Sequence, residues 1–140
     1  MEKTSLDIKA VAYDIFEALN MNLRFMDPVD HDLQFADISH LSHISSFMLG
    51  KTVLDKMRDD SHILDMAGSG FSTTVRLAKS SPSTWVPIFI DNKENILESL
   101  DLYINNLIAF RDKIANEDQQ GLTDEMAEIN KIKKVLDYGS

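Results

Sequence analysis

An apolar repeat between Ile96 and Ile114 is the feature that most constrains the fold of this chain. Its members recur at spacings of four, three, four, three and four residues: Ile96, Leu100, Tyr103, Leu107, Phe110 and Ile114. This spacing places them along one side of a long α-helix. Further apolar residues widen the arc: Leu97, Ile104 and Ile108. A helix that is apolar over so wide an arc is unsuited to a surface, so we expect it at the centre of the domain or of an interface between two copies.

Capping residues and prolines predict shorter helices elsewhere, so the expected fold class is mainly α. These helices are expected to begin at Thr4 or Ser5, Pro28, His62, Ser72 or Thr73, Pro82 and Thr123. The helix from Pro28 takes Asp27 as its cap and is expected to run to about Met57. Glycines are expected to interrupt the helical chain at Gly68–Gly70 and at Gly121.

A short strand is predicted between the first two helices. Leu23 and Phe25 alternate with polar residues over Met21 to Met26, which is typical of a half-buried strand, and Asp27-Pro28 ends it. The rest of the sequence offers this single strand nothing to pair with. We therefore interpret residues 1–27 as a helix-strand unit at the edge of a sheet whose other strands are absent from this sequence, and residues 28–140 as a separate helical domain.

The charge and the cysteine content exclude several classes of partner and site. The chain carries a formal charge of -9 and has no cysteine among its 140 residues. Excess negative charge argues against nucleic acid and anionic membranes, because phosphates are bound by clustered Lys and Arg. Without cysteine there is no disulfide, thiolate nucleophile or thiolate metal site. The sequence also lacks an apolar run long enough to span a membrane, and Met1 to Lys9 lack the apolar core of a signal peptide, so we expect a cytoplasmic protein.

Three of the four histidines lie close together in the sequence, at His31, His40 and His43. His40 and His43 are three residues apart, and Ser39 and His43 are four apart, so these side chains share one helical face. They could converge there on one small polar ligand. A metal site would require an HExxH pattern or a cysteine pair, and neither is present, so no metal is predicted. The alternative is that these histidines are surface or capping residues.

A glycine-rich segment, Gly68-Ser69-Gly70, precedes Arg76. A dinucleotide fingerprint would need a strand before it, whereas the preceding segment is predicted as helix, so a turn between two helices is the favoured interpretation. The turn still brings backbone N–H groups and a helix start to one place, and these favour anions, as does Arg76. A surface ion pair is the alternative for Arg76. Trp85, the single tryptophan, is expected in a core.

Taken in order, these residues resemble the C-terminal domain of prephenate dehydrogenase. That family carries an HD pair, an SHLPH segment, a GGGF segment, an arginine, a tryptophan and an ENK segment at similar gaps. The matching positions are His31-Asp32, Ser39–His43, Gly68–Phe71, Arg76, Trp85 and Asn92-Lys93. The resemblance covers about Asp27 to Ala115, and the helix and strand before it resemble the last unit of the family's nucleotide-binding domain. Three positions depart from the family pattern: Ser42, Ser69 and Thr73.

The resemblance implies an NAD-dependent oxidative decarboxylation of prephenate to 4-hydroxyphenylpyruvate, a step of tyrosine biosynthesis. It implies a homodimer formed through the helical domain, with NAD and the family's usual catalytic histidine held by a domain outside this chain. The chain alone is then expected to bind no NAD and to be inactive. Arg76 matches the arginine associated with a carboxylate of the dicarboxylate substrate, His43 lines the same pocket and His31 lies near it. The remaining predicted substrate-binding residues are Ser39, His40 and Trp85.

Two other functions stay open at this point. One is a non-catalytic helical dimerisation or regulatory module that binds an aromatic amino acid. The other is a stand-alone metal-dependent enzyme that uses the histidine cluster. A pocket that holds His43 and Arg76 together would favour the dehydrogenase, an interface without such a pocket would favour the module, and a bound metal ion would favour the third function.

Overall fold

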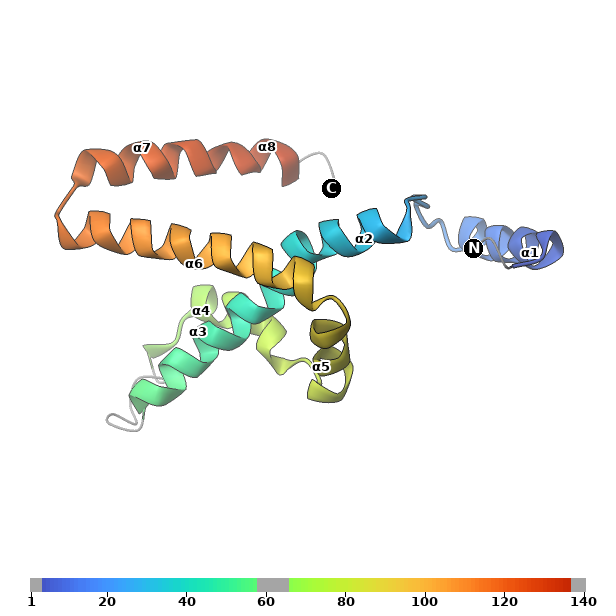
Figure 1. The fold of residues 1–140 in the computed structure, drawn as a ribbon, viewed down its shortest axis with the longest axis horizontal. Helices are drawn as coiled ribbons and strands as arrows, with labels where there is room; N and C mark the ends of the chain where they lie inside the picture. Colours follow the sequence, from blue (N-terminus) through green and yellow to red (C-terminus); the bar gives the residue numbers. More distant parts are fainter. Residues whose placement is uncertain (1–3, 58–65, 137–140) are drawn as a thin grey trace. The chain divides into compact units, whose positions relative to one another are not determined.

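The computed structural model describes residues 4–57 and 66–136, and the side chain of residue 135 is left out of that description. The chain divides into two compact units, Met1–His31 and Asp32–Ser140. The elements follow in the order shown in Figure 1, and all of those described are helices, so the predicted mainly α class is confirmed. The helix predicted at His62 falls outside the described residues.

The first unit contains helix α1, Leu6–Ala18, and the start of α2, Pro28–Phe35. Ser5 caps α1 by accepting a hydrogen bond from the amide of Ile8, as predicted. The helix stops because Asn20 adopts a left-handed conformation with φ 53, which an asparagine tolerates better than most residues. The α1 stripe is largely exposed, with Ile8 62% and Ile15 52% accessible.

The strand predicted over Met21–Met26 is wrong. Residues 21–27 have no regular secondary structure, and no strand occurs in the described part of the chain. A strand is stabilised by hydrogen bonds to a neighbouring strand, and the alternation of Leu23 and Phe25 cannot supply that neighbour. The segment is instead held by a ring contact, in which the centroids of Phe25 and Tyr13 are 5.9 Å apart.

The helix predicted from Pro28 to Met57 is confirmed, with one change of helical type within it. Asp27 caps its start, because its carboxylate accepts a hydrogen bond of 2.8 Å from the amide of Val29. After α2, residues Ala36–His40 form a π-helical turn, η1, and α3 continues as Leu41–Met57. A π turn inserts one residue into a helix and is frequent at functional sites. Here it buries Ala36 and His40 on the inside of the second unit.

Two predicted helix starts are wrong. Helix α4, Ser69–Thr74, begins after Gly68 rather than at Ser72 or Thr73, and a 3-10 helix, η3, follows at Arg76–Lys79. Gly68–Gly70 therefore opens a helix instead of forming a turn between helices. A serine or threonine is tolerated inside a helix when its hydroxyl donates a hydrogen bond to the carbonyl four residues earlier. Thr74 makes such a bond, of 2.9 Å, to the carbonyl of Gly70.

The other misplaced start is that of α7, Gln119–Ile129, predicted at Thr123. The chain turns before it, at Glu117, whose φ of 53 is left-handed, and Asp118 caps the helix by accepting from the amide of Gly121. The left-handed residue that ends the preceding helix is thus not a glycine, and Gly121 lies inside α7. Two short elements complete the described chain, η4 at Asn130–Ile132 and α8 at Lys133–Leu136.

The predicted central helix is α6, Lys93–Ala115. It is preceded by α5, Pro82–Asp91, which begins at Pro82 as expected. One flank of α6 packs within the unit: Ile96 is 5% accessible, and the hydroxyl of Tyr103 lies 2.9 Å from that of Ser45 on α3. Near its end, Lys113 forms an ion pair of 2.6 Å with Glu125 on α7.

The opposite flank of α6 is exposed. Leu97 is 56% accessible, Ile104 43%, Leu107 51% and Ile108 50%. Spacings of three, four and seven residues place these four side chains on one face of the helix. One flank of the wide apolar arc therefore contacts the unit's interior, and the other presents an apolar surface outward. The interface between two copies that was considered from the sequence stays a prediction.

Candidate functional site

The π turn and the start of α3 present His40 and His43 from the same stretch of helix. His43 is half-buried, and its Nδ1 lies 3.0 Å from the carbonyl oxygen of Ser39. A carbonyl oxygen can only accept, so Nδ1 of His43 carries the proton and donates it. The Nε2 atom of a neutral His43 is thereby left as an acceptor, and it becomes a donor when the ring is protonated.

Trp85 on α5 joins the two histidines. Its ring is stacked on that of His43, with centroids 3.4 Å apart and an interplanar angle of 24°. His40 meets Trp85 edge-on at 6.0 Å, and Phe89 lies on the same side of α5 at 5.6 Å from the tryptophan. The tryptophan is only half-buried, so the expectation that it lies in a core is wrong. It lies instead at the side of this cluster, against the two histidines.

Asn92, at the junction of α5 and α6, fixes the buried His40. Its side-chain amide donates 2.7 Å to the backbone oxygen of Asp32 and lies 3.3 Å from Nδ1 of His40. An amide NH₂ can only donate, so Nδ1 of His40 is the acceptor. Asn95 in turn donates to the side-chain oxygen of Asn92 at 2.7 Å. This network holds the ring of His40 in one orientation beside Trp85.

Arg76 is the first residue of η3, and its side chain is exposed. Within the described ranges no hydrogen bond or ion pair occupies its guanidinium group. The surface ion pair considered as its alternative role is therefore not formed there. Helix η3 packs on α3, the helix that carries His43. The contact is made at Ala78, because a Cβ placed on Gly50 of α3 would lie 3.8 Å from the Cβ of Ala78.

The structure thus brings four of the six predicted site residues together: Ser39, His40, His43 and Trp85. Arg76 belongs to a helix packed on the same α3, and no direct contact joins it to His43. His31 lies in the first unit with an exposed side chain. Across the two described stretches, no group of three or more His, Asp or Glu side chains is arranged to hold a metal ion.

Sequence reasoning missed two features of this region. Asn92 was identified only as part of a segment that matches the family. Its hydrogen bond to His40 was missed because the two residues are 52 positions apart in the sequence. An apolar groove of about 680 Å³ beside Phe89 was missed altogether. It is lined mainly by apolar residues: Ile44, Phe47, Met48, Leu54, Ala78 and Phe89. The spacing of its α3 members, at three and four residues, could have indicated it.

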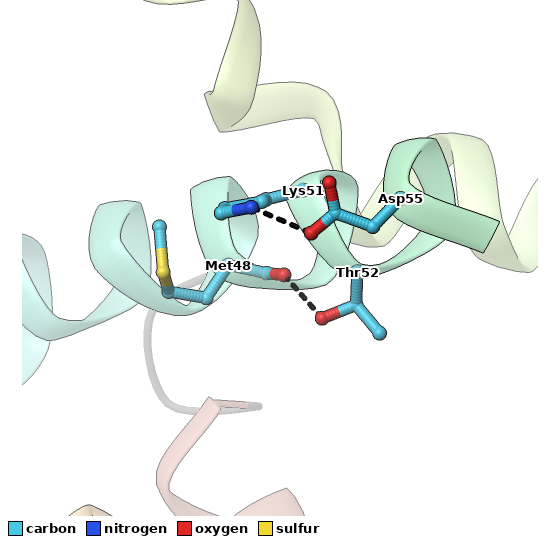
Figure 2. Close-up of polar contacts among 4 residues, drawn as sticks. All are labelled: Met48, Lys51, Thr52 and Asp55. Carbon is cyan, nitrogen blue, oxygen red and sulfur yellow. Dashed lines mark hydrogen bonds and ion pairs between the residues drawn. The ribbon is translucent and has the colours of Figure 1, made fainter. Parts of the chain in front are cut away.

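Lys51 and Asp55 add polar groups to the lining of the groove on α3, and Figure 2 shows the polar contacts around them. Lys51 and Asp55, one turn apart, form an ion pair of 2.5 Å, and Thr52 donates 2.8 Å to the backbone oxygen of Met48. The side chains of the ion pair are 63% and 47% accessible, so it contributes little to stability.

No helix in the described parts of the chain is long and apolar enough to cross a membrane.

Comparison with known proteins agrees with this helical architecture. Residues 27–128 match the family model described as prephenate dehydrogenase, dimerization domain. The chain is 28% identical to a cyclohexadienyl dehydrogenase of Zymomonas mobilis over 91% of its own length and 45% of that protein. It is 27% identical to a prephenate dehydrogenase of Bacillus subtilis over 86% of its length and 33% of that protein. It therefore spans less than half the length of these relatives.

A solved structure gives the same answer. The prephenate dehydrogenase of Aquifex aeolicus, in complex with hydroxyphenyl propionate and NAD⁺, matches 96% of this chain and 47% of its own, with 28% identity and a TM-score of 0.78. A helical dimerization domain is thus the class that fold and comparison define. The chain belongs to the prephenate dehydrogenase family, as the residues from His31 to Lys93 predicted.

Proposed function

We propose that this chain forms the substrate-binding and dimerisation part of an NAD-dependent prephenate dehydrogenase, which converts prephenate to 4-hydroxyphenylpyruvate in tyrosine biosynthesis. The observation that carries the proposal is the stacked His43–Trp85 pair inside the matched family segment, next to a helix that begins with the unpaired Arg76. An aromatic wall, a histidine nitrogen and a guanidinium group are the groups that a ring-bearing dicarboxylate requires.

Each site residue has a distinct role in this proposal. Arg76 binds a carboxylate of prephenate with two parallel hydrogen bonds, for which its planar guanidinium group is suited. His43, held by Ser39, offers Nε2 to a polar group of the substrate. Trp85 packs against the ring, and the network around Asn92 and His40 holds Trp85 in place. We also assign His31 a place near the substrate.

The residues present do not fit a nicotinamide dinucleotide. A pyrophosphate is bound where a strand leads through glycines into a helix. Gly68–Gly70 opens the short helix α4 without a preceding strand in the described part of the chain. NAD therefore belongs, in this proposal, to a nucleotide-binding domain, of which we interpret residues 1–27 as the last unit. We place the enzyme in the cytoplasm, where a cysteine-free biosynthetic enzyme is expected.

Dimerisation follows from the exposed flank of α6. Leu97, Ile104, Leu107 and Ile108 are four large apolar side chains exposed on one face of a helix, and contiguous exposed apolar residues often mark an interaction surface. Two copies related by a two-fold axis would cover each other's patch, which makes a symmetric homodimer the simplest closed assembly.

We expect this chain alone to bind no NAD. Titration of the chain with NAD in a calorimeter should give no saturable heat at micromolar concentrations, because the described residues form no strand-glycine-helix unit that could bind a pyrophosphate. Light scattering on the same sample should give twice the mass of one chain, which shows that the protein is folded and assembled. Saturable NAD binding at micromolar affinity would contradict the proposal that NAD is bound by a separate nucleotide-binding domain.

A further inference from the structure

We propose that Ser46 is a positioning residue for Arg76. This inference rests on the proposed function, because it concerns how the carboxylate-binding arginine is held. Ser46 lies on α3 and is 2% accessible, which makes it one of the most buried polar residues described. Its hydroxyl donates a hydrogen bond of 3.0 Å to the backbone oxygen of Thr74 and accepts one of 3.0 Å from the amide of Ala78.

These two backbone groups would bond to each other in an uninterrupted α-helix. Thr74 and Ala78 are four residues apart, and an α-helix joins the amide of each residue to the carbonyl four residues earlier. The hydroxyl of Ser46 is inserted between them and satisfies both. Insertion of a side chain into this hydrogen-bond ladder is a recognised cause of a helix bend. At this point the α-helix α4 ends at its cap residue Val75, with φ -89 and ψ 7, and the 3-10 helix η3 begins.

The inserted hydroxyl determines the helical type of the segment that carries Arg76. With its bond to Thr74 replaced, the amide of Ala78 also donates 3.0 Å to the carbonyl of Val75, which is the 3-10 pattern. A 3-10 helix turns by 120° per residue and an α-helix by 100°, so the choice redirects a side chain by roughly 20° per residue. Arg76 lies midway between the two residues that Ser46 contacts. Its direction therefore depends on that hydroxyl.

Ser46 also links Arg76 to the rest of the site. It lies three residues after His43 on α3, so the same helix presents His43 and holds the backbone on either side of Arg76 through the hydroxyl of Ser46. Four residues further on, a Cβ placed on Gly50 would meet the side chain of Ala78 at 3.8 Å, an ordinary packing distance, so η3 also lies against α3 at this point. In this proposal the hydroxyl of Ser46 sets the spacing between the arginine and the histidine of the site.

The first test uses this chain and NMR. Ser46→Ala should shift the amide signals of residues 74–78 and the Nε signal of Arg76, because the backbone is free to restore the bond between Thr74 and Ala78. Signals of α7 should stay in place. Ser42→Ala is the matched control. It removes a hydroxyl from the same helix, and that hydroxyl donates its hydrogen bond to the carbonyl of Ile38, away from residues 74–78. Unchanged signals around Arg76, or an unfolded variant, would overturn the proposal.

The second test uses an enzyme that combines this domain with a nucleotide-binding domain. Ser46→Ala should raise the KM for prephenate by about three- to tenfold, the range of one neutral hydrogen bond, with kcat and the KM for NAD nearly unchanged. The same substitution in an Arg76→Ala background should add almost nothing. A full additional loss in that background would show that Ser46 acts independently of Arg76 and would overturn the proposal. If the enzyme with native Ser46 does not oxidise prephenate, the proposed function is contradicted. The NMR result alone then decides whether Ser46 positions Arg76.

Discussion

Replacing Arg76 with alanine is expected to lower kcat/KM for prephenate by about ten- to a hundred-fold in an enzyme that contains this domain and a nucleotide-binding domain. The chain has a formal charge of -9, so a dicarboxylate must be held by a local cation that outweighs the general repulsion. Hydrogen bonds to charged groups contribute roughly 1.5 to 3 kcal/mol, which corresponds to this loss. Steady-state kinetics with prephenate as the varied substrate measures it.

Lys79→Ala is the matched control for Arg76→Ala. Lys79 is an exposed cation at the other end of η3, so its loss lowers the net charge equally without removing the guanidinium group. It should change kcat/KM by less than about twofold, as expected of an exposed charge. His43→Ala should act in the same direction as Arg76→Ala but more weakly, because neutral hydrogen bonds are about half as strong. An unchanged KM for prephenate in Arg76→Ala, or damage to folding and dimerisation alone, would make Arg76 a structural residue.

Replacing Ile104 with glutamate is expected to convert the proposed homodimer into monomers. Ile104 is 43% accessible in the single chain and lies near the middle of the exposed flank of α6. A two-fold interface buries the new carboxylate twice, and each buried, unpaired charge costs several kcal/mol. The dimer dissociation constant should therefore rise by at least about a thousand-fold. Light scattering at tens of micromolar should change from twice the mass of the chain to the mass of one.

Asn105→Glu provides the comparison on the same helix. Asn105 is exposed and already polar, and it lies about 100° around the helix from Ile104. This variant should stay dimeric. A dimeric Ile104→Glu protein, or equal dissociation by both variants, would show that the apolar flank of α6 is not the interface.

The elements that were predicted correctly depend on interactions within a few residues. Ser5 and Asp27 mark helix starts because a cap acts on amides two or three residues away. Pro82 marks a third start because proline fits the first position of a helix. The repeat in α6 is visible because helical periodicity is local. The strand at residues 21–26 failed for the opposite reason, since local alternation carries no information about whether a partner strand is present.

The site could be predicted as a set of residues but not as a geometry. Ser39, His40, His43 and Trp85 were identified from their spacing and order, yet the stacking of Trp85 on His43 depends on how α5 packs against α3. The π turn at Ala36–His40 has no signature in the sequence, because a π turn and an α-helix accept the same residues.

Ser46 shows the same limit most clearly. In the sequence it is an ordinary serine in a helix, whereas its hydroxyl bridges backbone groups 28 and 32 residues away. Only the packing of η3 on α3 reveals the contact.

The most direct test of the proposed function joins this chain to the nucleotide-binding part of the Aquifex aeolicus prephenate dehydrogenase, whose structure it matches with a TM-score of 0.78. NADH absorbance then reports the reaction. We predict NADH formation that depends on prephenate, saturates with it and is strongly reduced by Arg76→Ala. A chimaeric protein that is dimeric and binds NAD but forms no NADH from prephenate would contradict the assignment of this domain as the substrate-binding part of a prephenate dehydrogenase.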